Sequence, residues 1–501
     1  MKSQALLTGE RQVAKIAARL DATIAVNFNR KPIGDLPRSP LTAYFAKPMH
    51  LPRLLTLLIA AGVSCAALAN PFETTLKNGL RIIVNEDHRA PTAVQMVWYR
   101  IGSMDEVDGA SGVAHVLEHM MFKGTPMVGP GEFNRRVAEA GGRDNAFTSR
   151  DYTAYFQQVP KEKLGDMMQL EADRMRHLNV DPKEFAQEIK VVMEERRMRT
   201  DDNPESKLME QMNAVALQAH PYRRPIIGWM SDLETMTAAD AKAWYDQWYV
   251  PNNAYVVISG DVDHQAVFAL AEKHYGALDS RPLPQRRITE EPAQEGTRRL
   301  TVKAPAELPV LIMGYKAPVL RDVEKDSDPY ALEMLAAVLD GHNAARFNKH
   351  LVREQKIALS TGIGYDSTAR GPGMIYLSGT PAEGRTVGEL EAALRAEIAS
   401  VQKNGVTETE LKRARAQVVA AQIYKKDSMF GQAMEIGQTE AVGISYRQID
   451  RMLEKLQQVS AADIQAAARK YFTDDTLTVG TLDPQPLDGK PRRPASTAHR
   501  H

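Results

Sequence analysis

The chain has 501 residues, of which 43% are hydrophobic and 25% charged, as expected for a globular protein with more than one domain. Its formal net charge is zero, but the part after residue 69 has 54 basic and 60 acidic residues, which argues against nucleic acid as the main partner. The single cysteine, Cys65, excludes a disulfide framework, and it leaves the rest of the chain without a cysteine zinc site or a cysteine nucleophile.

The N-terminus has the pattern of an export signal with an additional segment in front of it. A basic start at Met49–Arg53 precedes an apolar run, which ends in the small residues of Ala67-Leu68-Ala69. We therefore predict that residues 1–48 are a non-native extension and that residues 49–69 are a signal peptide. The mature protein is then exported, to the periplasm of a Gram-negative bacterium, with no stable membrane insertion. A membrane anchor or a lipid attached at Cys65 is the alternative, although the run is short for a membrane span.

Hydrophobic periodicity predicts alternating strands and helices up to residue 275. Strands are expected at 74–85 (a hairpin turning at Asn78-Gly79), 92–101, 144–159 (a strand pair) and 254–259. Helices are expected at 112–125, 132–140, 161–176, 184–199, 238–248 and 265–275. The next segment, Leu278–Arg299, is rich in Pro, Arg, Gln and Glu without an apolar period, which is typical of a linker.

After the linker a similar order of elements begins again. Strands are expected at 309–315, 360–365 and 374–380, and helices at 328–340, 344–353, 387–401 and 406–424. The segment that starts at Val180 aligns with the segment that starts at Val406, which indicates an internal duplication. The predicted fold class is therefore α+β, with two homologous domains that each pack a mainly antiparallel sheet against helices. The expected boundaries are 70–280 for a metal-bearing domain, 281–300 for the linker, 301–486 for a domain without metal and 487–501 for a disordered tail.

The segment Gly112–Thr125 contains an H-x-x-E-H array formed by His115, Glu118 and His119. On a helix the two histidines lie four residues apart on one face, where they can hold one Zn²⁺ at about 2.0–2.1 Å each. Glu118 projects from the same side and can take a proton from a water on the metal. The alternative is a polar helix face that carries these residues by chance.

A third ligand is expected to be a carboxylate on another helix. The candidates are Glu184, Glu188, Glu194 and Glu195. Glu188 and Glu195 are two turns apart and share a face, although a solvated acidic face is the simpler interpretation of such a run. In the duplication Glu195 falls opposite Ala421, and the nearest metal-binding feature of the second half is the lone His342. We therefore predict that only the first half holds a metal.

Three segments, HVLEHMMFKGT, GGRDNAFTSRDYTAYF and EIKVVMEERR, resemble those of the pitrilysin-type (inverzincin) zinc metallopeptidases. The resemblance covers about residues 73–485 and is strongest to the subgroup of the mitochondrial processing peptidase β subunit and bacterial two-domain homologues. It implies one Zn²⁺ per chain. The implied site residues are the zinc ligands His115, His119 and Glu195, the general base Glu118, the supporting carboxylate Glu188, and Asn145, Ala146 and Phe147 on an edge strand to which a peptide substrate adds.

The sequence departs from the family pattern in its second half. Family members with a complete site carry an Arg and, seven residues later, a Tyr that reach the substrate. Here Arg353 is kept, but Ser360 stands at the Tyr position and Tyr365 is out of register. Arg353 is thus a candidate substrate-binding residue, with a simple surface cation as the alternative.

These features together predict a zinc endopeptidase that acts on peptides or unfolded segments and forms one half of a peptide-enclosing chamber. A homodimer, or a heterodimer with a related chain that carries the Arg/Tyr pair, would complete the chamber. The alternative is a non-catalytic or weakly active peptide-binding subunit of a heterodimeric peptidase. A purely structural zinc site is a weaker interpretation, because three protein ligands leave a fourth position open.

Overall fold

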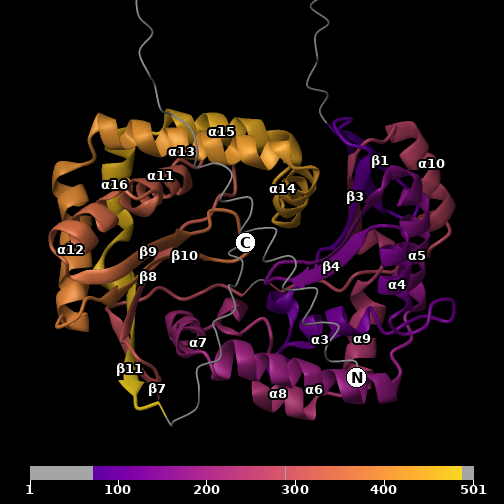
Figure 1. The fold of residues 1–501 in the computed structure, drawn as a ribbon, viewed down its shortest axis with the longest axis horizontal. Coiled ribbons are helices and arrows are strands. Elements are labelled where there is room, and N and C mark those ends of the chain that lie inside the picture. Colours follow the sequence, from indigo (N-terminus) through magenta and orange to yellow (C-terminus); the bar gives the residue numbers. More distant parts are fainter. Residues whose placement is uncertain (1–70, 288, 488–501) are drawn as a thin grey trace, which may run out of the picture. The chain divides into compact units, whose positions relative to one another are not determined.

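The computed structural model describes residues 71–287 and 289–487, which form two domains of one sheet and several helices each (Figure 1). The predicted extension at 1–48, the predicted signal peptide at 49–69 and residues 488–501 of the predicted tail lie outside the described residues. Within the described ranges, no helix combines the length and the apolar character that a membrane span requires.

The first domain is built on a six-stranded sheet, sheet 1, with the spatial order β1-β2-β6-β3-β5-β4. Its strands are β1 (Phe72–Thr75), β2 (Arg81–Glu86), β3 (Thr92–Tyr99), β4 (Arg143–Thr148), β5 (Thr153–Pro160) and β6 (Ala254–Gly260). All neighbours are antiparallel except β2 and β6. The central strands β3 and β6 are buried on both faces, which explains their near-continuous apolar sequence. Strand β4 lies at one edge.

Helices cover both faces of sheet 1. The helices of the first domain are α3 (Val113–Met120), α4 (Glu132–Glu139), α5 (Leu164–His177), α6 (Pro182–Arg196), α7 (Pro204–Ala216), α8 (Met230–Thr235), α9 (Ala238–Trp248) and α10 (His264–Tyr275). Val97 and Tyr99 of β3 pack in one core with residues of α3, α5, α9 and α10. Because side chains alternate along a strand, Met96 and Trp98 point to the opposite face.

The second domain repeats this plan with a five-stranded sheet, sheet 2, in the order β7-β11-β8-β10-β9. Its strands are β7 (Arg298–Pro305), β8 (Val310–Ala317), β9 (Ala358–Tyr365), β10 (Gly373–Pro381) and β11 (Leu477–Gln485). Its helices are α11 (Asp328–Asp340), the π-helix η6 (Phe347–Glu354), α12 (Val387–Asn404), α13 (Glu408–Asp427), α14 (Met429–Ala441), α15 (Ile449–Gln458) and α16 (Ala461–Tyr471).

Each strand of sheet 2 has a counterpart in sheet 1, and only β1 of sheet 1 has none. The order of sheet 2 corresponds to β2-β6-β3-β5-β4 of sheet 1, and each sheet contains one parallel pair, β2 with β6 and β7 with β11. This agreement confirms the predicted fold class of two homologous domains with mainly antiparallel sheets.

Each domain contributes one helix that packs on the sheet of the other domain. Helix α7 of the first domain packs on sheet 2, where Leu208 and Met212 join the core formed by β7, β8 and β11. Helix α14 of the second domain packs on sheet 1, where Ala433 and Ile436 lie in one core with Trp98. Each sheet therefore depends on the other domain to cover one of its faces.

Several elements were not predicted from the sequence, namely α7, α8, α14, α15, α16, β7 and β11. The predicted linker was also too long at its C-terminal end, because β7 begins at Arg298 and pairs with β11. The rest of the linker is fastened to the domains. The Glu291 carboxylate accepts hydrogen bonds from the backbone N–H groups of residues 218–220, with N···O distances of 2.9–3.0 Å. The helix expected at 344–353 is a π-helix at Phe347–Glu354.

Candidate metal centre

The start of α3 is fixed by a glycine and a buried carboxylate. Gly112 has φ 89°, and a Cβ there would lie 2.6 Å from the backbone oxygen of Ile227, so only glycine fits. The Glu106 carboxylate accepts the N–H groups of Gly112 and Ala114 at 2.9 Å each. It thereby satisfies donors that a helix N-terminus leaves without intrahelical partners. The H-x-x-E-H array follows directly on this fixed first turn.

Helix α6 packs against α3 and supplies the acidic side of the site. It starts at Pro182 after Asp181, whose side chain caps the helix. Glu188 and Glu195 lie on the face that meets α3, as their spacing predicts. The Glu195 Oε2 atom is 3.8 Å from His115 Nε2 and 3.3 Å from His119 Nε2. The ligand atoms of these three residues all lie within 4.8 Å of one another.

The arrangement fits a zinc ion. Ligand atoms bound tetrahedrally at about 2.0–2.2 Å lie roughly 3.4 Å apart, close to the 3.3 and 3.8 Å separations from the Glu195 oxygen. Two imidazole nitrogens and one carboxylate oxygen are a donor set typical of catalytic zinc, which keeps a fourth position for water or substrate. The structure therefore brings together His115, His119 and Glu195 as a triad that could hold a metal ion.

The buried ring of His115 and the carboxylates around His119 together suit a bound cation. Burial lowers the pKa of His115 to about 4, so its ring is neutral and offers a lone pair. Burial also opposes charge on His119, but hydrogen bonds to Glu188 and Glu195 raise the pKa of this ring to about 9. In the absence of metal, His119 is thus protonated and forms hydrogen bonds with both carboxylates. A metal cation that binds here would displace that proton.

Three further residues hold the ligands in place. His119 Nδ1 contacts Glu188 Oε1 at 2.9 Å, and Lys123 forms an ion pair with the same carboxylate. Arg199, in the π-helical turn η3 (Arg197–Asp201), contacts Glu195 Oε1 at 2.6 Å and leaves Oε2 directed at the histidines. Such outer partners orient metal ligands. Lys123 and Arg199 were not predicted from the sequence, although each is four residues after a predicted ligand.

Glu118, on α3, lies beside the end of the edge strand β4. The Thr148 hydroxyl, on the last residue of β4, donates a hydrogen bond to Glu118 Oε2. Burial raises the pKa of Glu118, and the bond from Thr148 partly offsets this effect. The predicted peptide-binding residues Asn145, Ala146 and Phe147 precede Thr148 on β4. The candidate base therefore stands where a strand added to β4 would pass.

Other predicted candidates lie elsewhere. Glu194 is exposed on α6 and pairs with Arg197 at 3.3 Å instead of facing α3. Arg353 is exposed in η6, and Ser360 is exposed in β9, the edge strand of sheet 2. No contact described for Arg353 joins it to the triad, so its role in substrate binding stays a prediction. His342 is half-buried after α11, and its Nδ1 accepts a hydrogen bond from the backbone N–H of Ala344.

The chain thus combines two duplicated sheet-and-helix domains with one candidate metal-binding triad beside a glutamate. Residues 81–229 match the family described as "Insulinase (Peptidase family M16)", and residues 235–418 match "Peptidase M16 inactive domain". The zinc protease PqqE of Helicobacter pylori is 36% identical over 310 residues, which cover 60% of this chain and 69% of that protein. The chain belongs to peptidase family M16.

Solved structures agree with this assignment. A crystal structure of a protease from Helicobacter pylori superposes with a TM-score of 0.78 at 29% identity, covering 83% of this chain and 99% of the other. The periplasmic protease PqqL of Escherichia coli shares the fold with a TM-score of 0.72 at 18% identity. That match covers 83% of this chain but only 48% of PqqL.

Proposed function

We propose that the chain is a zinc-dependent endopeptidase that hydrolyses peptides or unfolded segments. The observation that carries the proposal is the convergence of His115, His119 and Glu195 beside Glu118, at the end of the edge strand β4. The names of its relatives as zinc proteases support the same activity.

The substrate would bind as an additional strand on β4. In sheet 1 this strand pairs only with β5, so its outer backbone groups are available to an extended peptide. Asn145 is exposed and Phe147 is half-buried, as expected for a strand with one side open to a ligand. A peptide in this position runs past Thr148 and presents a backbone carbonyl next to Glu118.

When bound by the triad, zinc supplies a water of lowered pKa and polarises the scissile carbonyl. Glu118 acts as the general base: it takes the proton of the attacking water and passes it to the leaving amine. Thr148 holds one carboxylate oxygen of Glu118 and leaves the other free for this transfer. Glu188 orients His119, and Arg199 keeps one oxygen of Glu195 directed at the metal position.

A partner chain would complete the reaction chamber. PqqL is about twice as long as the region that matches this chain, so a second copy of this chain, or a related chain, would supply a matching half. In the described residues Arg353 and Ser360 do not reach the triad, so the partner is the proposed source of a second group that stabilises the developing oxyanion. The signal-like pattern before residue 70 supports an exported, periplasmic location.

The test is hydrolysis of a quenched peptide by the purified chain, with and without a chelator and a candidate partner. Glu118→Gln is expected to keep zinc and to lose about 10²–10⁴-fold in rate. Glu194→Gln is the matched control, since this neighbouring glutamate faces solvent and pairs with a surface arginine. Unchanged cleavage by Glu118→Gln, or chelator-resistant cleavage by the wild type, would contradict the proposal.

A further inference from the structure

A cavity of about 370 Å³ opens where α14 stops covering sheet 1. It is lined by Arg81, Arg100, Glu440, Ala441, Gly443, Ile444 and Ser445. Arg81 begins β2, Arg100 follows β3, and the other residues belong to the end of α14 and the turn after it. The cavity lies on the sheet face covered by α14, which is opposite the face covered by α3. It is therefore separate from the candidate metal centre.

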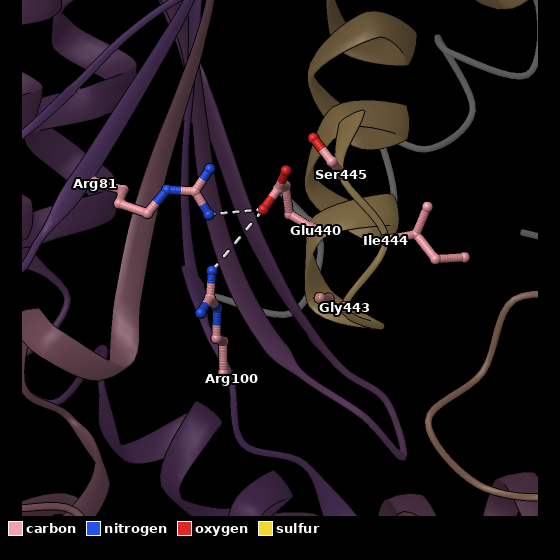
Figure 2. A pocket seen from close by; sticks show the side chains of 7 residues that line it. Arg81, Arg100, Glu440, Gly443, Ile444 and Ser445 are labelled. Atoms are coloured by element: carbon pink, nitrogen blue, oxygen red, sulfur yellow. Dashed lines mark hydrogen bonds and ion pairs between the residues drawn. The ribbon is translucent and has the colours of Figure 1, made fainter. Parts of the chain in front are cut away.

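Strand alternation explains why two arginines meet here. Ile83, two residues after Arg81, and Trp98, two residues before Arg100, both point to the α14 face. The arginines continue these rows beyond the end of the helix. Figure 2 shows their guanidinium groups pointing toward the Glu440 carboxylate, one from β2 and one from just after β3, with Ile444 and Ser445 beyond it.

The two arginines differ in how well they are paired. Arg81 contacts Glu440 Oε2 at 2.7 Å and Glu73 at 3.3 Å. Arg100 reaches Glu440 only at 3.9 Å, too far for a hydrogen bond. Its Nε atom is buried without a hydrogen-bond partner among the described residues, so the donors that face Glu440 are those of its terminal nitrogens. Its side chain is 38% exposed. Arg100 therefore has donors to offer to a ligand in the cavity.

The guanidinium of Arg100 is nevertheless held in position. It lies 5.1 Å from the ring centre of Tyr255, and the Tyr255 hydroxyl donates to the Gly437 carbonyl of α14 at 2.7 Å. Held between the sheet and the helix, the cation needs little ordering when a ligand binds, which favours affinity.

Charge and shape select the class of ligand. Arg447 shares Glu73 with Arg81, so three guanidinium groups face two carboxylates and leave a surplus of one positive charge. A monoanion balances this surplus. Ala441 and Ile444 add an apolar wall, which suits an organic group next to the anion. We propose that this cavity binds organic carboxylates through Arg100, either the C-terminal carboxylate of a peptide or a free small acid.

Calorimetric titration with N-acetyl-alanine and its neutral amide tests the proposal. We expect the acid to bind to the zinc-loaded protein and the amide to bind at least tenfold more weakly. N-acetyl-trialanine and propionate, both monoanions, titrated in parallel, distinguish a peptide terminus from a free small acid. Equal binding of acid and amide, or no binding of any acid, would overturn the proposal.

Titration after zinc removal separates this cavity from the metal centre. We expect the affinity for the acid to be unchanged without zinc, whereas a carboxylate that binds at the metal would no longer bind. This result does not depend on peptidase activity, so it can fail or succeed independently of the proposed function. Loss of binding on zinc removal would overturn the proposal.

Two substitutions of opposite effect complete the test. Arg100→Gln is expected to weaken acid binding at least tenfold, while Arg413→Gln, which removes an exposed cation of α13, leaves it unchanged. Glu440→Gln removes the competing internal carboxylate and is expected to strengthen binding severalfold. A misfolded variant could not produce that gain. Unchanged affinity in both Arg100→Gln and Glu440→Gln would contradict the assignment.

Discussion

Helices α3 and α11 occupy equivalent places in the two domains. Helix α3 contacts β4, α6 and α9, and α11 makes the corresponding contacts with β9, α13 and α16. The starts of α3, α4 and β4 precede the starts of α11, η6 and β9 by one constant separation along the chain. With this separation Tyr330 stands opposite His115, Met334 opposite His119, and Glu333 opposite Glu118.

Helix α13, the counterpart of α6, also lacks the residues that α6 contributes to the candidate metal centre. When Val180 is aligned with Val406, Ala414 stands opposite Glu188, Ala421 opposite Glu195, and Lys425 opposite Arg199. The second domain thus lacks all three zinc ligands and the supporting carboxylate. It keeps the glutamate, and Glu333 forms a hydrogen bond with Ser367 just after β9, as Glu118 does with Thr148 at the end of β4.

The comparison shows which part of the site belongs to the fold and which part to the chemistry. Both domains have a glutamate that forms a hydrogen bond with a hydroxyl group near the end of the edge strand. This feature is therefore no sign of activity by itself. The two imidazoles and the carboxylate of α6 distinguish the first domain, and in the proposed function they are the residues that hold a metal beside the shared glutamate.

Because α7 and α14 each pack on the sheet of the other domain, we expect the two domains to unfold together. Leu208→Ala in α7 removes a fully buried side chain from the core of sheet 2 and is expected to cost about 2–5 kcal/mol. All four tryptophans lie in the first domain, so their fluorescence reports mainly on that domain, although Trp98 also packs against α14. We expect the denaturant midpoints from tryptophan fluorescence and from far-ultraviolet circular dichroism to fall together.

Ile436→Ala in α14 is the reciprocal variant and is expected to behave in the same way, because Ile436 is buried against sheet 1. Val191→Ala, at an exposed position of α6, is the control and should change stability by less than about 0.5 kcal/mol. If Leu208→Ala moved the circular dichroism transition and left the fluorescence transition in place, the domains would be independent.

Glu333→Gln tests whether the glutamate of the second domain affects only stability, unlike Glu118. Burial, together with Asp366, raises the pKa of Glu333 to about 7, while Lys425 and the bond to Ser367 act in the opposite direction. The folded protein therefore binds a proton more tightly than the unfolded chain, so this group lowers stability as pH rises from about 4.5 to 7. The amide carries no charge. We expect the variant to be about 1–3 kcal/mol more stable than the wild type at pH 8 and equally stable at pH 4.

The same variant should cleave peptides at the wild-type rate, unlike Glu118→Gln. Denaturant unfolding at several pH values and the peptide assay measure the two effects. A loss of activity in Glu333→Gln would show that the second domain takes part in the chemistry, and the distinction between the domains would be wrong.

Arg199→Gln tests the outer contact of the metal site and has the smallest expected effect. The arginine is 73% exposed, so its ion pair with Glu195 is screened by solvent. We expect zinc affinity, measured by competition with a chelator, to fall about threefold to tenfold, with partial recovery in Arg199→Lys. Arg197→Gln, which removes an arginine that pairs with Glu194 instead, should leave the affinity unchanged. An equal loss in this control would remove the assigned role.

Local sequence patterns predicted the part of the site that lies on one helix. The spacing of His115 and His119 alone places them on one face, and the shared face of Glu188 and Glu195 follows from the same periodicity. The choice of Glu195 as the third ligand needed the resemblance to a family, because packing of α6 on α3 is a tertiary contact. Most central strands were predicted because their apolar runs are continuous.

The missed elements depend on contacts between segments that are distant in the chain. Helices α7 and α14 bury their apolar residues against the sheet of the other domain, and β7 is ordered by β11, at the opposite end of the second domain's sequence. The cavity beside Arg100 was missed for the same reason. Arg81 begins β2 and Arg100 follows β3. Only the order of the strands in sheet 1 and the position of the end of α14 show that the two arginines line one cavity.

The central claim is that one zinc ion binds between α3 and α6 and none binds at the equivalent place in the second domain. X-ray diffraction from crystals of the zinc-loaded protein, recorded at the zinc absorption edge, tests it directly. We predict a single anomalous peak at about 2.0–2.2 Å from His115 Nε2, His119 Nε2 and Glu195 Oε2, and no such peak in crystals of Glu195→Gln grown without added zinc. A peak beside Glu333, or none near the two histidines, would contradict the account.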